Sequence, residues 1–398
     1  MKNFRLYIPT DIHFGNDRLD ELPEILAEYG KKVLLTYGGG SIKRTGLYDK
    51  ISDLLDEAGF EVTELSGIAP NPKIDSVRKG VALIRENDIE VILAVGGGSV
   101  IDASKVIAGG VYYEGDPWDL VLDNKKMGQA IPIVDVLTLA ATGTEMNRNA
   151  VISNPETNEK LGTSGWNLIP KASFLDPVNT FSVPKNQTAA GSADILSHLF
   201  EQYFNRTKGT DVQDNIAEGL MKAVIKNCPV ALENPEDYNA RANLMWSSTL
   251  ALNGIPGNGR SGGWTCHPIE HELSAYYDIT HGVGLAILTP RWMKFCVDTD
   301  PTTHEKFATY ARNVWDVQEK DNEKAAHIGI EKTYHYFKKT TSVPMTLPEV
   351  GIADTKLVHE MSEHAVKNGH LGIAPFVPLE VSDVEKIINE CFTDMTEF

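Results

Sequence analysis

The 398-residue sequence is poor in cysteine, in long apolar runs and in positive charge. Its four cysteines are widely spaced and form no C-x-x-C pair: Cys228, Cys266, Cys296 and Cys391. This spacing excludes a dense disulfide framework and favours free thiols in a reducing compartment. No apolar span of about 18 residues occurs, and MKNFRLYIPTDIHFG at the N-terminus is mixed and polar rather than signal-like. We therefore expect a cytoplasmic protein without a membrane partner.

Basic residues are outnumbered, with 37 Lys and Arg against 55 Asp and Glu, which gives a formal net charge of -18. A nucleic-acid partner is therefore not expected, because phosphate binding needs clustered Lys and Arg. Apolar residues make up 42% of the chain, so a sizeable core can be buried. The length exceeds one typical core and predicts two domains with a cleft.

The first part of the chain alternates helical and strand patterns. A near-continuous apolar strand that leads into a glycine turn and a helix is typical of a doubly wound parallel sheet. The patterns predict helices at 19–30, 46–59, 76–89 and 100–110, and strands with glycine turns at 31–41 and 90–99.

The pattern changes near residue 178, after a turn-rich passage. Beyond it helical periodicity dominates, at 193–204, 212–226, 240–252 and 324–339. We therefore predict a dinucleotide-binding α/β domain over 1–178 and an all-helical domain over 179–398.

The stretch AVGGGSVIDASK places three glycines between a strand and a helix. Here the backbone can approach a pyrophosphate, and the helix N-terminus offers free N–H groups. A tight turn without a ligand is the alternative, and the flanking strand and helix favour the phosphate cradle. Neither G-x-G-x-x-G nor G-x-x-x-x-G-K-[ST] is present.

The stretch YGGGSIK repeats this device after the strand at 31–41. An NAD site commonly offers an acid to the ribose 2′-hydroxyl, whereas an NADP site donates to a 2′-phosphate. The glycines at 38–40 carry no acid, and Ser41 and Lys43 can donate, so NADPH is favoured over NADH. A third loop, TLAATGTEMN at 138–147, is rich in hydroxyls; a binding loop and an ordinary surface turn both fit it.

Histidines gather in the second part of the chain. Asp194 and His198 stand four apart and share a helical face, although such a pair is also a common surface ion pair. His267 and His271 form a second pair of this spacing, and His281 follows beside glycines. One carboxylate with two or three imidazoles suits Zn²⁺ or Fe²⁺. A catalytic metal needs an open position, so one histidine is spare, and spacing leaves its identity open.

The motifs GGGSVIDASK, ATGTE, DILSH, HPIEH and ITHG occur together, in an order that resembles the iron-containing (group III) alcohol dehydrogenase family. The similarity covers essentially the whole chain. YGGGSIK and NEKLGTSGW look most similar to its branch of NADPH-dependent butanol dehydrogenases and broad-range aldehyde reductases. The resemblance implies an N-terminal domain with a Rossmann-like parallel sheet and an all-helical C-terminal metal domain, as in the dehydroquinate synthase-like fold. It also implies a homodimer.

The resemblance assigns roles to individual residues. It implies a proton-relay role for His271, and it implies these metal ligands: Asp194, His198, His267 and His281. It implies these cofactor contacts: Gly38, Gly39, Ser41, Gly96, Gly97, Gly98, Ser99, Asp102, Thr138, Thr142 and Lys160. Pro268 departs from the small residues common in the family, and it fits best in the first turn of a helix.

The activity implied is reversible hydride transfer between NADP(H) and a primary alcohol or aldehyde such as butanol or butanal, with Fe²⁺ or, alternatively, Zn²⁺. A second hypothesis is an NAD- and zinc-dependent lyase of the dehydroquinate synthase type. Its phosphorylated acid substrate needs several Lys and Arg, but Arg260 is the one strong base between 254 and 290. A third is an acidic scaffold with a structural metal, which would close with four Cys or His ligands.

Overall fold

The computed structural model describes residues 1–374 and 376–398. Its contacts group into two units. An α/β unit comprises Tyr7–Val183 and Pro235–Thr249, and a helical unit comprises Met1–Leu6, Pro184–Asn234 and Leu250–Phe398. The domain boundary expected near residue 178 stays a prediction. The short segment 1–6 groups with the helical unit, and the segment 235–249 groups with the α/β unit.

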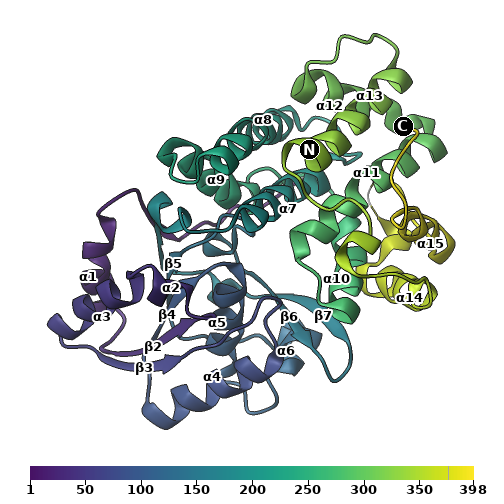
Figure 1. The fold of residues 1–398 in the computed structure, drawn as a ribbon. Helices are drawn as coiled ribbons and strands as arrows, with labels where there is room; N and C mark the ends of the chain where they lie inside the picture. Colours follow the sequence, from purple (N-terminus) through teal and green to yellow (C-terminus); the bar gives the residue numbers. More distant parts are fainter. Residues whose placement is uncertain (375) are drawn as a thin grey trace. The chain divides into compact units, whose positions relative to one another are not determined.

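The α/β unit is built on a six-stranded parallel sheet (Figure 1). The strand order is β1-β8-β5-β4-β2-β3, which confirms the predicted Rossmann-like parallel sheet. The strands are β1 (Asp11–Phe14), β2 (Lys32–Tyr37), β3 (Glu61–Leu65), β4 (Val91–Gly96), β5 (Ile133–Leu137) and β8 (Ala172–Leu175). β4 and β5 are buried along their whole length, as continuous apolar runs in a covered parallel sheet should be.

Two apolar clusters cover the two faces of this sheet. On one face lie α1 (Leu22–Ala27) and α3 (Leu47–Glu57). On the other lie α4 (Ile74–Asn87), α5 (Gly98–Gly110) and the short α6 (Trp118–Leu122). The remaining elements of the unit are the short α2 (Ser41–Arg44) and an antiparallel pair, β6 (Asn149–Asn154) with β7 (Glu159–Ser164).

The carboxyl ends of β2, β4 and β5 meet at one edge of the sheet. Tyr37 pairs with Val95, and Gly96 pairs with Leu137, so the three strands end at the same level. The loops that follow them are the three loops in which the sequence places its cofactor residues. In an open parallel sheet, ligands bind outside this edge.

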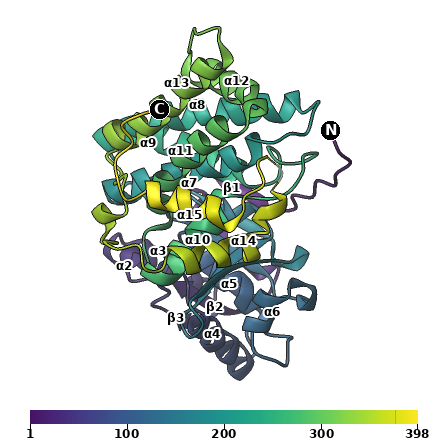
Figure 2. The same ribbon diagram turned by 90° about the vertical axis from the view of Figure 1, so that its right-hand side faces the viewer.

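The other unit is helical along the described part of its length, as the periodicity predicted. Its helices are α7 (Lys185–Tyr203), α8 (Asp211–Glu233), α10 (Cys266–Tyr277), α11 (His281–Thr299), α12 (His304–Trp315), α13 (Asn322–His335), α14 (Val358–Gly369) and α15 (Val381–Glu390). Helix α9 (Tyr238–Ala251) lies mostly in the segment that groups with the sheet. α14 and α15 pack side by side, and α14 also packs on α10 (Figure 2).

Helix α7 forms the centre of the helical unit. Every residue from Thr188 to Glu201 is buried, and small side chains at 189–193 let neighbouring helices approach closely. At Gly282 of α11, a Cβ would lie 2.0 Å from the backbone oxygen of Ala190 on α7. The glycine that follows His281 is therefore required by the contact between α7 and α11.

The sequence also led to expectations about the cysteines and about membrane-spanning segments. All four cysteines are buried free thiols, as their spacing predicted. Among the described residues, no helix combines the length and apolar character needed to cross a membrane.

The contact at Gly282 predicts a large stability loss for Gly282→Ala. Backbone atoms cannot rotate away from the added methyl, so we expect overpacking to cost about 1–3 kcal/mol. The control is Gly219→Ala, at an exposed position within α8 where the new Cβ meets nothing within 4 Å; it should stabilise the protein by about 1 kcal/mol. Thermal unfolding of both variants measures the difference. Equal midpoints would show that α7 and α11 are not in tight contact.

Candidate functional site

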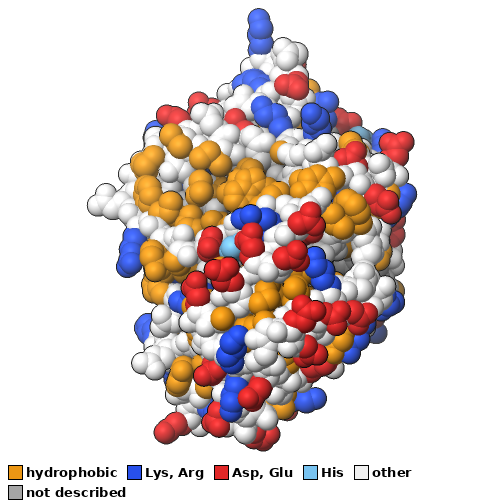
Figure 3. Space-filling model, turned by 90° about the vertical axis from the view of Figure 1, so that its left-hand side faces the viewer, with side chains coloured by type: hydrophobic (Ala, Val, Ile, Leu, Met, Phe, Trp, Pro, Cys, Tyr) orange, Lys and Arg blue, Asp and Glu red, His pale blue; other side chains and the backbone are white. Residues whose placement is uncertain are grey.

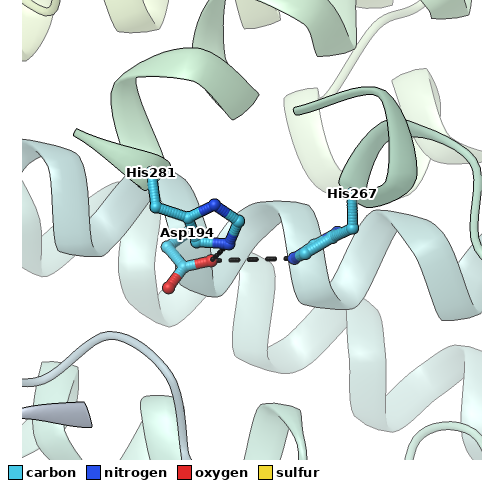
Figure 4. Close-up of side chains that lie close together, drawn as sticks. All are labelled: Asp194, His267 and His281. Atoms are coloured by element: carbon cyan, nitrogen blue, oxygen red, sulfur yellow. Dashed lines mark ion pairs between the residues drawn. The ribbon is translucent and has the colours of Figure 1, made fainter. Parts of the chain in front are cut away.

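Three imidazoles converge on one carboxylate inside the helical unit. Asp194 and His198 lie one turn apart on α7, His267 is the second residue of α10, and His281 is the first residue of α11. Their Nε2 atoms lie 3.5 Å (His198), 3.8 Å (His267) and 3.7 Å (His281) from Asp194 Oδ1. Figure 4 shows the rings of His267 and His281 turned toward this oxygen.

The donor atoms of this cluster fit a metal ion. Asp194 Oδ1 and His267 Nε2 are buried and have no hydrogen-bond partner among the described residues. A buried polar atom without a partner is costly, and a cation would satisfy both atoms at once. Ligand atoms of Asp194, His267 and His281 all lie within 4.8 Å of one another, a donor set suited to Zn²⁺ or Fe²⁺. His198 Nε2 is not in this group but lies 3.5 Å from the same Asp194 oxygen.

The charges in the cluster shift two pKa values strongly. Burial alone would raise the pKa of Asp194, but the charges of the surrounding histidines, His198 foremost, hold it well below its usual range. Burial alone would lower the pKa of His267, but the neighbouring carboxylates of Asp194 and Glu201 raise it to about 9. Without a metal ion, the cluster therefore favours positive charge beside Asp194. A bound cation would supply such a charge.

Two further carboxylates support the imidazoles, and the sequence analysis missed both. Glu201 of α7 lies 3.2 Å from His267 Nδ1, and Glu270 of α10 contacts His281 Nδ1. The available signal was spacing, because Glu201 follows His198 by three residues and Glu270 follows His267 by three.

His271 lies beside the cluster rather than in it. Its ring centre is 5.6 Å from that of His281 and 6.3 Å from that of His267. Potential ligand atoms of His271, Glu270 and His281 also come within 4.8 Å of one another, so two overlapping groups share His281. The contacts to Asp194 single out His198, His267 and His281.

The local chain around these histidines is shaped by proline, glycine and tryptophan. Pro268 is the third residue of α10, in the first turn as expected, where its missing N–H costs nothing. At Gly284 a Cβ would lie 2.8 Å from Glu270 Cγ, so a small residue is needed there. Trp264 lies against the rings of His198 and His267, with centres 5.6 and 4.5 Å apart.

The α/β unit brings the predicted diphosphate residues together. Gly96 ends β4, Gly97 caps α5 without a side-chain hydrogen bond, and Gly98 and Ser99 form the first turn of α5. The N-terminus of this helix thus offers backbone N–H groups. The backbone N–H of Thr138 donates to the Gly96 oxygen over 3.0 Å.

The glycine triplet also serves packing. A Cβ at Gly98 would lie 2.4 Å from Thr142 Oγ1, and one at Gly97 would lie 3.1 Å from the Leu139 Cβ. The loop at 138–142 therefore packs against the triplet, which places Thr138 and Thr142 beside it.

Asp102 and Lys160 lie deeper in the unit. Asp102 accepts hydrogen bonds from Thr144 Oγ1 at 2.6 Å and from the Val151 backbone at 2.9 Å, so it ties α5 to β6. Burial raises its pKa. Lys160 is buried on β7, opposite Ser153.

Lys105 is a buried cation that the sequence analysis did not single out. Its Nζ donates to the backbone oxygens of Thr144, Asn147 and Asn149 at 2.6–2.9 Å. Burial lowers its pKa to about 8. The signal was a lysine three residues after Asp102 in a largely apolar helix, and its contacts fix the loop that follows Thr142.

The loop predicted to bind a 2′-phosphate, residues 38–43, is open, but its positive charge is more fully paired than its sequence implies. A Cβ on Gly39 would meet nothing within 4 Å, and Ser41 is exposed. Lys43 Nζ, however, lies 3.8 Å from Glu64 Oε2 and 4.2 Å from the centre of the Tyr48 ring. Its positive charge is already matched by a carboxylate.

A cavity of about 560 Å³ lies beside these loops within the α/β unit. Its walls include Gly46 and Leu47 at the start of α3, Val136 of β5, and Phe174 and Leu175 of β8. This volume is in the range of small-molecule pockets. The lining mixes apolar side chains with charged ones, among them Asp17, Arg18, Lys50 and Asp176.

Family models match both parts of the chain. "Iron-containing alcohol dehydrogenase" matches residues 9–177, and "Fe-containing alcohol dehydrogenase family, C-terminal" matches residues 188–392. The chain belongs to the iron-containing alcohol dehydrogenase family. The resemblance inferred from the motifs is thereby confirmed.

Individual relatives match almost end to end. NADH-dependent butanol dehydrogenase A of Clostridium acetobutylicum is 50% identical over 98% of this chain and 100% of its own. NADPH-dependent aldehyde reductase YqhD of Escherichia coli is 37% identical over 96% of this chain and 98% of its own. The crystal structure of NADH-dependent butanol dehydrogenase A from Thermotoga maritima superposes with a TM-score of 0.92, at 40% identity and with 99% of each chain covered.

Family membership makes the chain an NAD(P)-dependent alcohol dehydrogenase, an oxidoreductase that acts on CH–OH groups. It also confirms the predicted fold class, a parallel α/β domain followed by a helical domain. The roles of individual site residues stay predictions.

The convergent donors predict that a divalent cation stabilises the folded chain through Asp194. After chelator treatment, Zn²⁺ at a hundredfold excess over its Kd should stabilise the protein by about 2.7 kcal/mol. Asp194→Asn should abolish the upward shift in Tm, while His359→Ala, at an exposed histidine of α14, should retain it. Identical shifts in the Asp194 variant and the parent would exclude the cluster as the metal site.

Proposed function

We propose that the protein is a metal-dependent alcohol dehydrogenase and aldehyde reductase, which transfers a hydride between a nicotinamide dinucleotide and a primary alcohol or aldehyde such as butanol or butanal. The observation that carries this proposal is the convergence of three imidazole Nε2 atoms on the buried Asp194 carboxylate. Several relatives are butanol dehydrogenases and one is an aldehyde reductase, which supports the substrate class.

The metal ligands in this proposal are Asp194, His198, His267 and His281, with Fe²⁺ as the metal and Zn²⁺ as the alternative. When bound, the cation would supply Lewis-acid polarisation of a carbonyl oxygen. The protein holds the four donor atoms together at the junction of α7, α10 and α11 and keeps Asp194 ionised. Trp264 shields the rings of His198 and His267 from water on one side.

His271 is proposed to hold the proton that completes the alcohol. It is only partly buried and lies on the same face of α10 as His267, one turn further along. An imidazole can exchange a proton near neutral pH, which suits this role.

The cofactor is proposed to bind at the carboxyl edge of the sheet. The contacts proposed for its diphosphate and nearby groups are Gly96, Gly97, Gly98, Ser99 and Asp102, with Thr138 and Thr142 on the flanking loop and Lys160 as a further cofactor contact. The cavity beside Gly46 and Phe174 has the size and apolar walls for the adenosine end. When bound, the nicotinamide would supply or accept the hydride.

Between the two nicotinamide cofactors, the corner formed by Gly38, Gly39 and Ser41 favours NADH. The preference for NADPH inferred from sequence relied on the absence of an acid at 38–40 and on Ser41 and Lys43 as donors, and in the structure Lys43 Nζ lies 3.8 Å from Glu64 Oε2. A 2′-phosphate here would meet the Glu64 carboxylate as well as Lys43. Four relatives that are 43–50% identical carry NADH in their names, which supports the same choice.

A neutral substrate is favoured over the phosphorylated acid of a dehydroquinate synthase-type lyase. Arg260, the one strong base at 254–290, is 8% exposed and donates to Asp214 over 2.6 Å. Its charge is therefore taken up inside the helical unit.

A homodimer is proposed for the assembled protein. Large apolar side chains are exposed near the N-terminus, with Phe4 51% and Leu6 46% exposed. The face drawn in Figure 3 also carries a broad group of hydrophobic side chains above a region where acidic and basic side chains mix.

The four buried thiols support the proposed cytoplasmic location.

An anaerobic assay with Fe²⁺ tests the function directly. We expect butanal to oxidise NADH with a higher kcat/KM than NADPH. The reaction is monitored by the loss of absorbance of the reduced nicotinamide. Metal-free protein is the control and should be inactive. No oxidation of either cofactor over a series of short aldehydes would refute the proposed activity, and a higher kcat/KM with NADPH would refute the cofactor choice alone.

Substitutions of the two histidines of α10 should differ in their effects on metal binding and activity. His267→Ala should lose bound metal together with activity, because it removes a ligand. His271→Ala should retain metal but lose about 10²–10⁴-fold in kcat, the range typical of an acid–base residue. Metal analysis of each purified variant, followed by steady-state kinetics, makes the comparison. Equal metal content in the two proteins would contradict these roles.

A further inference from the structure

Helix α10 begins without a cap of its own. Thr265 occupies the N-cap position and makes no side-chain hydrogen bond to the helix. The first N–H groups of a helix have no partner within it, and in a buried position they need one. The Glu201 carboxylate of α7 supplies it, accepting from the backbone N–H groups of Thr265 at 2.8 Å and of His267 at 2.9 Å.

The same carboxylate reaches the ring of His267. Glu201 Oε1 lies 3.2 Å from Nδ1 and receives both the backbone and the ring N–H of this residue. With the proton held on Nδ1, the lone pair of Nε2 faces Asp194 Oδ1. A carboxylate behind a metal-binding imidazole fixes the tautomer and the ring orientation in this way.

Glu270 repeats the arrangement between α10 and α11. One of its oxygens contacts His281 Nδ1 and the other accepts from the Ser274 hydroxyl. Glu270 is fully buried, and Gly284 leaves room for its side chain. The Nε2 of His281 is thereby directed at Asp194 Oδ1.

These contacts join three helices in a closed path. α7 holds α10 through Glu201 and His267, α10 holds α11 through Glu270 and His281, and α11 returns to α7 through His281 and Asp194. We propose that Glu201 and Glu270 are positioning residues that set the geometry and affinity of the metal site, with Glu201 also capping α10. This inference rests on the proposed metal centre.

Glu-to-Gln variants test the role because they keep the side-chain volume and remove the charge. Glu272→Gln is the matched control: Glu272 is a buried carboxylate on α10 that lies near Asn368 and His364 rather than the ligand set. Co²⁺ is the probe, titrated into metal-free full-length protein and followed by its visible absorption. Glu201→Gln and Glu270→Gln should weaken Co²⁺ binding by about 10- to 100-fold and shift the absorption bands. Glu272→Gln should match the parent in both.

Glu270→Gln keeps the test decisive if Glu201→Gln unfolds, because Glu270 contacts side chains and caps no helix. Parent-like Co²⁺ affinity and spectra in Glu270→Gln, and in Glu201→Gln where it folds, would overturn the positioning role while leaving the metal centre intact. An equal loss of affinity in Glu272→Gln would also overturn it, since any buried carboxylate would then have the same effect. A parent protein that binds no Co²⁺ would instead refute the proposed metal centre, and the positioning role with it.

Discussion

The helical unit depends on one buried charge, the carboxylate of Asp194. A buried carboxylate without partners is strongly destabilising, and breaking a buried pair costs about 3–5 kcal/mol. Asp194 therefore requires positive or proton-donating groups around it, and three helices provide an imidazole each. The small residues of α7 follow from the same requirement, because α11 must come close enough for His281 to reach Asp194.

His267 of α10 and His281 of α11 both lie in the first turn of their helices. The N-terminus of a helix favours negative charge. Glu201 meets this field at α10 and serves the fold and the imidazole together. Folding of α10 and orientation of His267 are thus coupled through one side chain.

Local patterns were sufficient to predict much of the fold and part of the site. The strand–glycine–helix order at 90–110 and the pair Asp194 and His198 are set by neighbours in sequence, and both appear as predicted. The convergence of His267 and His281 came from family resemblance, since spacing favoured His267 with His271. The spacing of Glu201 after His198 was a signal, but it could not reveal the role of Glu201, which depends on the N-terminus of a helix more than sixty residues away.

The cofactor loops show why residue type alone is a weak guide to a ligand. Gly97 and Gly98 are required by Leu139 and Thr142 packed against them, so the glycines would be needed even in a site that bound nothing. What indicates a ligand is the N-terminus of α5, which Gly97 caps without a side-chain hydrogen bond at the carboxyl edge of the sheet. Lys43 shows that the charge of a residue, taken alone, is also a weak guide to a ligand. Its sequence position suggests a phosphate donor, but Glu64 of the neighbouring strand lies 3.8 Å from its Nζ. That neighbour follows from the pairing of β2 with β3, which no local pattern contains.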